Sequence, residues 1–117
     1  MKNQKNLTFH LKVLIYQENF KGKILWCAHC LDFDIIADGD SPEESFSNLK
    51  ELVSTHVDYA IKNNLVDALY HPAPRRFWNE FYKENILSKK ADDSFLPIAP
   101  EIAFHAIQKL NANQKTI

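Results

Sequence analysis

The feature that most constrains this sequence is a helix start at residues 41–44, Ser-Pro-Glu-Glu. The Ser41 hydroxyl fits the N-cap position, where it accepts a backbone N–H of the first turn. Pro42 fits the first helical position, because the N–H that proline lacks has no partner there anyway. Glu44 lies three residues after the cap, and we expect its carboxylate to accept the Ser41 N–H in return. These residues predict a helix that begins at Pro42.

The residues after this start follow a helical period. Apolar side chains recur three or four positions apart and form one stripe: Phe46, Leu49, Val53, Val57, Ala60 and Ile61, widened by Leu52. Asn63 and Asn64 suit the end of the helix, because asparagine tolerates a left-handed backbone conformation. The pattern therefore predicts one amphipathic helix over Pro42–Lys62, with His56 as a partly buried structural side chain.

Three strands are expected before this helix. Residues Leu7–Tyr16 alternate between apolar and polar side chains, which predicts a half-buried strand. A turn is expected over Gln17–Gly22, so Ile24–Cys30 should return as the second strand of a hairpin. Phe33–Ala37 is the third expected strand. Gly39 follows it between two aspartates, where glycine adopts a positive φ at little cost.

The second half of the chain is organised differently. A connector over residues 65–73 is followed by a predicted helix from 74 or 75 to about 87, with a polar loop over 88–94. Prolines exclude a regular helix across 95–100, and residues 101–110 fit either a helix or a strand. The predicted helix has an aromatic buried face: Phe77, Trp78, Phe81 and Tyr82. Because 117 residues is the length of one domain, we predict a single α+β domain over residues 1–117.

Acidic side chains are concentrated in one segment. Residues 24–49 contain no lysine or arginine and six acids: Asp32, Asp34, Asp38, Asp40, Glu43 and Glu44. They are either solvated residues at turns and at a helix start, where acids are common, or a surface that attracts a basic partner. The net charge of -1 argues against a general nucleic-acid binder, which needs clustered lysine and arginine.

Composition indicates the expected cellular location and excludes some classes of cofactor. The sequence has no apolar run long enough to span a membrane, and its first residues do not resemble a secretory signal. With two cysteines and no such signal, we expect a reducing, cytoplasmic location. Only two glycines occur, so glycine-rich phosphate loops are excluded and no nucleotide cofactor is expected.

Two clusters contain residue types that could carry chemistry. Cys27 and Cys30 have the spacing of a zinc or redox pair, but tetrahedral zinc needs further ligands. Side chains three apart on a strand also face opposite sides, which favours two buried thiols that point apart. Asp32 and Asp34 are expected to share a strand face, but two carboxylates alone make a weak site for catalytic cations. We therefore expect no catalytic residue and no metal.

Three segments occur in a distinctive order: AHCLDFD at Ala28–Asp34, ADGDSPEES at Ala37–Ser45 and NLKEL at Asn48–Leu52. This order and most of these residues resemble the HicB antitoxin family, with Ser45 where alanine is usual. The resemblance covers about residues 7–63. It implies a βββαβ sheet similar to a reduced ribonuclease H fold, with residues 101–107 as the last strand, and so favours a strand there.

The resemblance also implies a function. It implies a non-catalytic antitoxin that binds and blocks a small basic ribonuclease toxin and that assembles as a homo-oligomer, a dimer or tetramer. Many members carry a C-terminal DNA-binding module, but the residues after 64 show no basic recognition helix, so the sequence gives no strong evidence for direct DNA or RNA binding.

One segment would make the partner contact. The candidate partner-binding residues are Trp26, His29, Leu31, Asp32, Phe33, Asp34 and Asp38. The acids would set on-rate and specificity, and the apolar side chains would supply much of the affinity. Two other functions are alternatives: a homo-oligomeric scaffold without a toxin partner, and a metal-dependent enzyme that uses Cys27, His29 and Cys30 or the aspartates.

Overall fold

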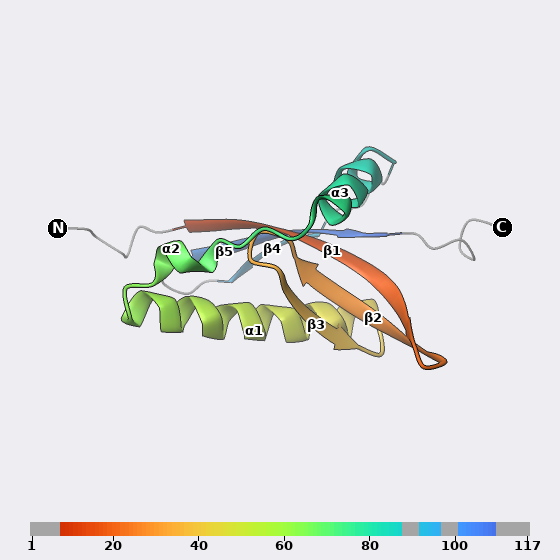
Figure 1. Cartoon of the computed structure of the whole chain (residues 1–117), viewed down its shortest axis with the longest axis horizontal. Coiled ribbons are helices and arrows are strands. Elements are labelled where there is room, and N and C mark those ends of the chain that lie inside the picture. The colour runs from red at the N-terminus through yellow and green to blue at the C-terminus, as the bar shows by residue number, and fades with distance from the viewer. Residues whose placement is uncertain (1–7, 88–91, 97–100, 110–117) are drawn as a thin grey trace.

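The computed structural model describes residues 8–87, 92–96 and 101–109, with side chains described at 8–84 and 101–109. It is an α+β fold, as the sequence predicts (Figure 1). The elements in chain order are β1 (Thr8–Phe20), β2 (Lys23–Cys30), β3 (Ile35–Gly39), α1 (Pro42–Lys62), α2 (Val66–Leu69), α3 (Arg75–Leu87), β4 (Asp92–Leu96) and β5 (Glu101–Gln108).

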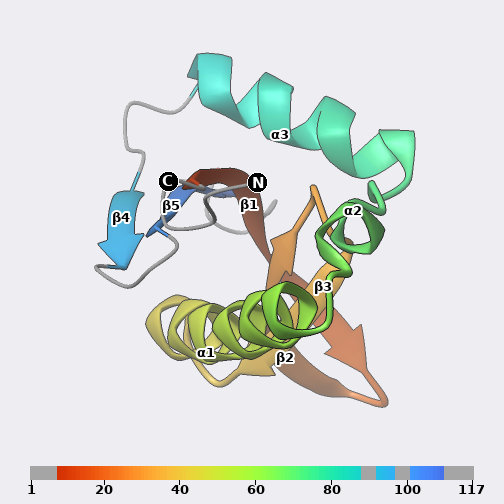
Figure 2. The ribbon, with the colours of Figure 1, turned by 90° about the vertical axis from the view of Figure 1, so that its left-hand side faces the viewer.

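The strands form one mixed sheet in the order β3-β2-β1-β5-β4. The pairs β1–β2, β2–β3 and β4–β5 are antiparallel, whereas β1 and β5 are parallel. Helix α1 lies against one face of this sheet and α3 against the other (Figure 2). The central strand β1 is therefore covered from both sides.

The β1–β2 hairpin differs from its prediction. Strand β1 continues to Phe20, and the turn contains only Lys21 and Gly22, so the expected turn is wrong over residues 17–20. Both turn residues have positive φ, 53° and 85°. A two-residue turn of this kind follows the right-handed twist of the strands it joins, which explains why a polar stretch remains paired. The Gly22 N–H also donates to Asn19 Oδ1 at 3.0 Å.

The third strand begins two residues later than predicted. Phe33 and Asp34 lie in the turn before β3, and Asp34 has a φ of 58°. The two aspartates 32 and 34 therefore do not share a strand face. The prediction for Gly39 is also wrong, because its φ is not positive. Gly39 is needed for a close approach instead, since a Cβ there would lie 2.7 Å from the backbone N of Ser45.

The bounds of α1 agree with the sequence prediction. The Ser41 Oγ accepts the Glu44 N–H at 3.0 Å, and Pro42 occupies the first turn. The Glu44 carboxylate accepts the Asp40 N–H at 2.7 Å, one residue earlier than expected. At the other end Asn64 has a φ of 57°, as a left-handed helix terminus requires.

Two hydrophobic cores lie on the two faces of the sheet. The core under α1 takes the odd-numbered side chains of β1 and the predicted stripe of α1: Phe9, Leu11, Val13, Ile15, Ala28, Cys30, Phe33, Phe46, Leu49, Val53, Val57, Ile102, Phe104 and Ala106. The core under α3 is smaller: Leu14, Leu31, Ala73, Phe81 and Ile107, with Tyr16, Phe77 and Trp78 packed against it. The prediction that Tyr82 is buried in this core is wrong, because its side chain is half exposed, whereas Glu84 on α3 is buried.

The end of the chain contains a strand where part of a polar loop was predicted, so the loop prediction is wrong over residues 92–94. Strand β4 occupies residues 92–94 of the predicted loop, and β5 confirms the strand favoured for residues 101–107. Leu7, the loop residues 88–91 and the prolines at 97 and 100 lie outside the described residues. Within the described part of the chain, no helix is both long and apolar enough to span a membrane.

Candidate functional site

The predicted partner-binding residues lie close together, but most of them point inward. Leu31 and Phe33 are 0% and 4% exposed, and His29 is 1% exposed. Trp26 is partly buried against the core under α1. Leu31 and Phe33, two of the three apolar side chains expected to anchor a partner, therefore belong to the core and do not reach the surface.

The turn at residues 31–34 is held in place by hydrogen bonds to β1 and to the connector. The Asp32 carboxylate accepts the Lys12 N–H at 2.7 Å, and the Leu31 N–H donates to the Lys12 carbonyl at 2.8 Å. The connector binds the same turn from outside, with His71 N–H donating to Asp32 O at 3.1 Å and Ala73 N–H donating to Leu31 O at 2.9 Å. Burial raises the pKa of Asp32. Asp32 is thus an internal acceptor rather than a surface charge.

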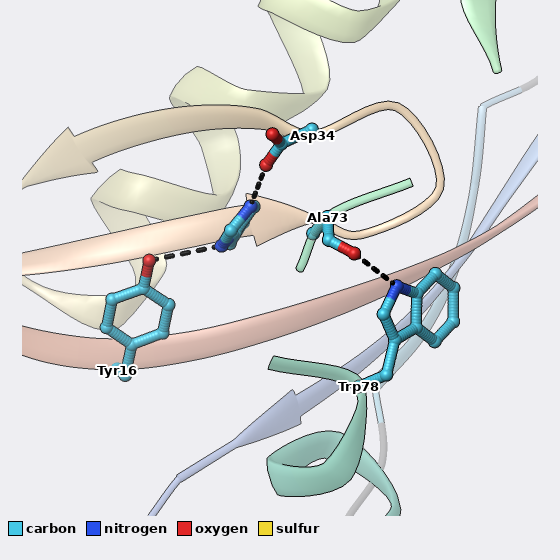
Figure 3. Close-up of polar contacts among 5 residues, drawn as sticks. Tyr16, Asp34, Ala73 and Trp78 are labelled. Atoms are coloured by element: carbon cyan, nitrogen blue, oxygen red, sulfur yellow. Dashed lines mark hydrogen bonds and ion pairs between the residues drawn. The ribbon is translucent and has the colours of Figure 1, made fainter. Parts of the chain in front are cut away.

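A half-buried polar cluster joins β1, β2 and the turn (Figure 3). The Tyr16 hydroxyl contacts His29 Nδ1 at 3.1 Å, and His29 Nε2 contacts Asp34 Oδ1 at 2.7 Å. Phe77 of α3 covers the imidazole edge-on, with ring centroids 4.6 Å apart, and the Arg76 guanidinium lies over the Phe77 ring. This contact links α3 to the strand that carries His29.

The cluster is consistent with one assignment of protons. Burial lowers the pKa of His29, and the hydrogen bond to Asp34 acts against that effect. A neutral ring with its proton on Nε2 donates to Asp34 and accepts from Tyr16, so each polar atom has a partner. Burial also raises the pKa of Tyr16. A hydroxyl held in its protonated form is a poor nucleophile, and the hydrogen bonds of the cluster tie the turn to β1 and β2.

The cluster predicts a pH dependence of stability. Because the folded pKa of His29 lies below the ordinary value of 6.5, the unfolded chain binds a proton first as the pH falls. The stability that the neutral ring contributes is present above pH 6.5 and is lost on acidification through the folded pKa. The free energy of unfolding, measured by urea titration at a series of pH values, should fall more steeply with decreasing pH for the native protein than for His29→Gln.

His56 provides the matched control for this prediction. It is exposed on α1, contrary to the expectation of partial burial, and its Nδ1 contacts the Leu52 carbonyl at 2.9 Å. A His56→Gln variant should keep the native dependence on pH. Identical slopes for the native protein and the His29 variant would contradict the role given to the buried ring.

The two cysteines lie on opposite faces of β2, as predicted. Cys30 belongs to the core under α1, and Cys27 is on the face that also carries His29. Burial raises the pKa of both thiols, that of Cys30 to about 12, so neither is poised as a nucleophile. Among the residues that the structure describes, no three His, Cys, Asp or Glu side chains are placed to hold a metal ion.

The exposed part of the site is an acidic strip, defined here as Asp38, Asp40, Glu43 and Glu44. All four side chains are exposed, and they run from the end of β3 into the first turn of α1. Ile36, two residues before Asp38 on the same face of β3, is 47% exposed. Sequence reasoning selected Asp38 but missed Ile36. The alternation of exposed and partly buried residues along β3 becomes visible only once the strand is placed correctly.

Comparisons of the chain with protein-family models, with curated proteins and with solved structures found no match. The function is therefore inferred from the residues themselves. In the half-buried Tyr16–His29–Asp34 cluster, both ring nitrogens of His29 have partners within the cluster. The side chains of the acidic strip and of Ile36 are exposed instead, and Ile36 and Asp38 lie on β3, the strand at the end of the sheet.

Proposed function

We propose that this chain is a HicB-like, non-catalytic antitoxin that binds and blocks a small basic ribonuclease toxin. The observation that carries the proposal is the acidic strip, four exposed carboxylates at the junction of β3 and α1. This junction coincides with the segment whose residues resemble the HicB family. The order of three strands, a long helix and a later strand beside β1 also supports the βββαβ arrangement, similar to a reduced ribonuclease H fold, that the resemblance implies.

The mechanism would be steric and electrostatic. A row of carboxylates at the surface attracts a basic protein and orients it before contact. Once docked, the antitoxin would cover the surface with which the toxin holds RNA, which is necessarily basic. The half-buried Asp34–His29 contact supports this arrangement because it fixes the turn that leads into β3.

The first experiment is recovery of the protein from its own cells, with and without ribonuclease treatment, followed by mass spectrometry. We expect a small basic protein in stoichiometric amount, retained after ribonuclease treatment and released at high salt. Recovery of the chain by itself, as a stable homo-oligomer, would contradict the antitoxin proposal and support the scaffold alternative.

Charge reversal locates the contact. We expect the triple variant Asp38→Lys, Asp40→Lys and Glu43→Lys to bind the recovered partner about tenfold more weakly or worse at low salt, chiefly through a slower association rate. The control variant carries the same change in net charge at exposed acids elsewhere, namely Glu51→Lys, Asp67→Lys and Glu101→Lys. Equal losses in both variants, measured by surface plasmon resonance, would mean that net charge and not the acidic strip drives binding. Asp32 and Asp34 are left intact because both hold the fold together.

A further inference from the structure

Strand β3 is at the end of the sheet. It pairs with β2 along one side, and among the described residues no strand pairs with its other side. The Asp38 carbonyl accepts a hydrogen bond from Asn48 Nδ2 at 3.0 Å, which closes the end of the strand nearest α1. In this register Ile35 and Ala37 face β2, so the backbone groups that remain open on the outer side are the Ile36 N–H and carbonyl and the Asp38 N–H. An edge of this kind is a template for another strand.

One face of β3 is covered and the other is open. Ile35 and Ala37 pack against the core under α1. On the opposite face, α3 reaches as far as His29 on β2, where Phe77 contacts the ring. Ile36 pairs with His29 across the strands but remains 47% exposed, and Asp38 beyond it is exposed. The open face therefore presents an apolar side chain and, two residues later, a carboxylate.

The charges on this edge favour one kind of added strand over another. A second copy of β3 would bring its own aspartates alongside Asp34 and Asp38, and like charges on neighbouring strands repel. A strand with lysine or arginine would instead meet opposite charges at both ends of the open stretch. The same carboxylates that disfavour pairing between two copies thus favour a basic strand from a different protein.

We infer that the partner docks by adding a β-strand to the open edge of β3. The strand it contributes carries an apolar side chain against Ile36 and a basic side chain against Asp38. Backbone hydrogen bonds would supply affinity and these two side chains the specificity, as in other cases of strand addition. This inference rests on the proposed function, since it names how the basic partner engages the acidic strip.

The test uses two synthetic ten-residue peptides of alternating lysine and valine. The second peptide is methylated at two adjacent central backbone nitrogens, which keeps its charge but blocks strand pairing. We expect the first peptide to bind at least about tenfold more tightly than the second. In hydrogen–deuterium exchange, its binding should slow exchange of the β3 amides while leaving the rest of α1 unchanged. Equal binding of the two peptides, protection confined to residues 41–44, or no binding of either would overturn strand addition.

A pair of variants distinguishes binding at the β3 edge from a general effect of added positive charge. Ile36→Lys places a cation on the open face, whereas Ser47→Lys places the same charge on an exposed position of α1. We expect the first to weaken binding of the recovered partner by about tenfold or more and the second by less than about threefold. Equal effects would overturn the inference and leave the acidic strip as the contact. A native dimer that Ile36→Lys converts to a monomer, in size-exclusion chromatography with light scattering, would identify a second copy as the occupant and overturn it as well. Absence of any basic partner in the recovery experiment would instead overturn the proposed function.

Discussion

Phe81→Ala is expected to lower the free energy of unfolding by about 3–5 kcal/mol. Phe81 is 1% exposed and is the buried aromatic anchor of α3 in the core with Leu14 and Ile107. This core is small, so few other side chains can move in to fill the cavity. Urea denaturation followed by far-ultraviolet circular dichroism measures the loss directly.

The neighbouring residue supplies the control. Tyr82 is 50% exposed and contacts only the rings of Trp78 and Phe81 among the described aromatic contacts. Tyr82→Ala should therefore cost about 1 kcal/mol or less. A loss from Phe81→Ala no larger than that from Tyr82→Ala would show that α3 adds little to the stability of the sheet.

Gly39→Ala is expected to cost about 1–3 kcal/mol, because the added methyl group meets backbone that cannot move independently. The Cβ would lie 2.7 Å from Ser45 N and 3.1 Å from the Glu44 carbonyl carbon, both in the first turn of α1. Relief of this clash must separate the end of β3 from the start of the helix. The same denaturation measurement applies.

Gly22→Ala distinguishes this clash from the ordinary effect of replacing a glycine. Gly22 has a φ of 85°, and a methyl group added there would meet no neighbouring atom within 4 Å. Its replacement should cost about 1 kcal/mol through backbone strain alone. Similar losses at the two positions would indicate that β3 and α1 separate easily, and the acidic strip would then not be held as one surface.

Helix α1 shows what local sequence predicts well. Its cap, its proline and its terminal asparagines act within a few residues of each other, so the bounds Pro42–Lys62 follow from adjacent residues. The hairpin turn is predicted less well, because its conformation does not follow from adjacent residues alone. Positive φ at Lys21 depends on the twist of two paired strands, which the polar residues before it do not reveal.

The choice between helix and strand for residues 101–110 depends on a strand that is far away in the sequence. The period of residues 101–110 fits two structures, and the pairing of β5 alongside β1, with Val13 opposite Ala106, decides between them. Covering both faces of β1 likewise needs α1 and α3, which are separated in the chain by the connector. Such pairings depend on chain closure over long distances rather than on local preference.

The α+β class, the long capped helix and the concentration of acids at its start follow from local patterns of residues. Which of those acids and apolar residues reach the surface depends on how the elements pack together. His29 on β2 and Leu31 in the turn after it lie on the face of the sheet away from α1, and α3 and the connector, far later in the chain, bury them. The physical reason is that a strand has two faces, and the face that becomes core is set by the element that packs on it.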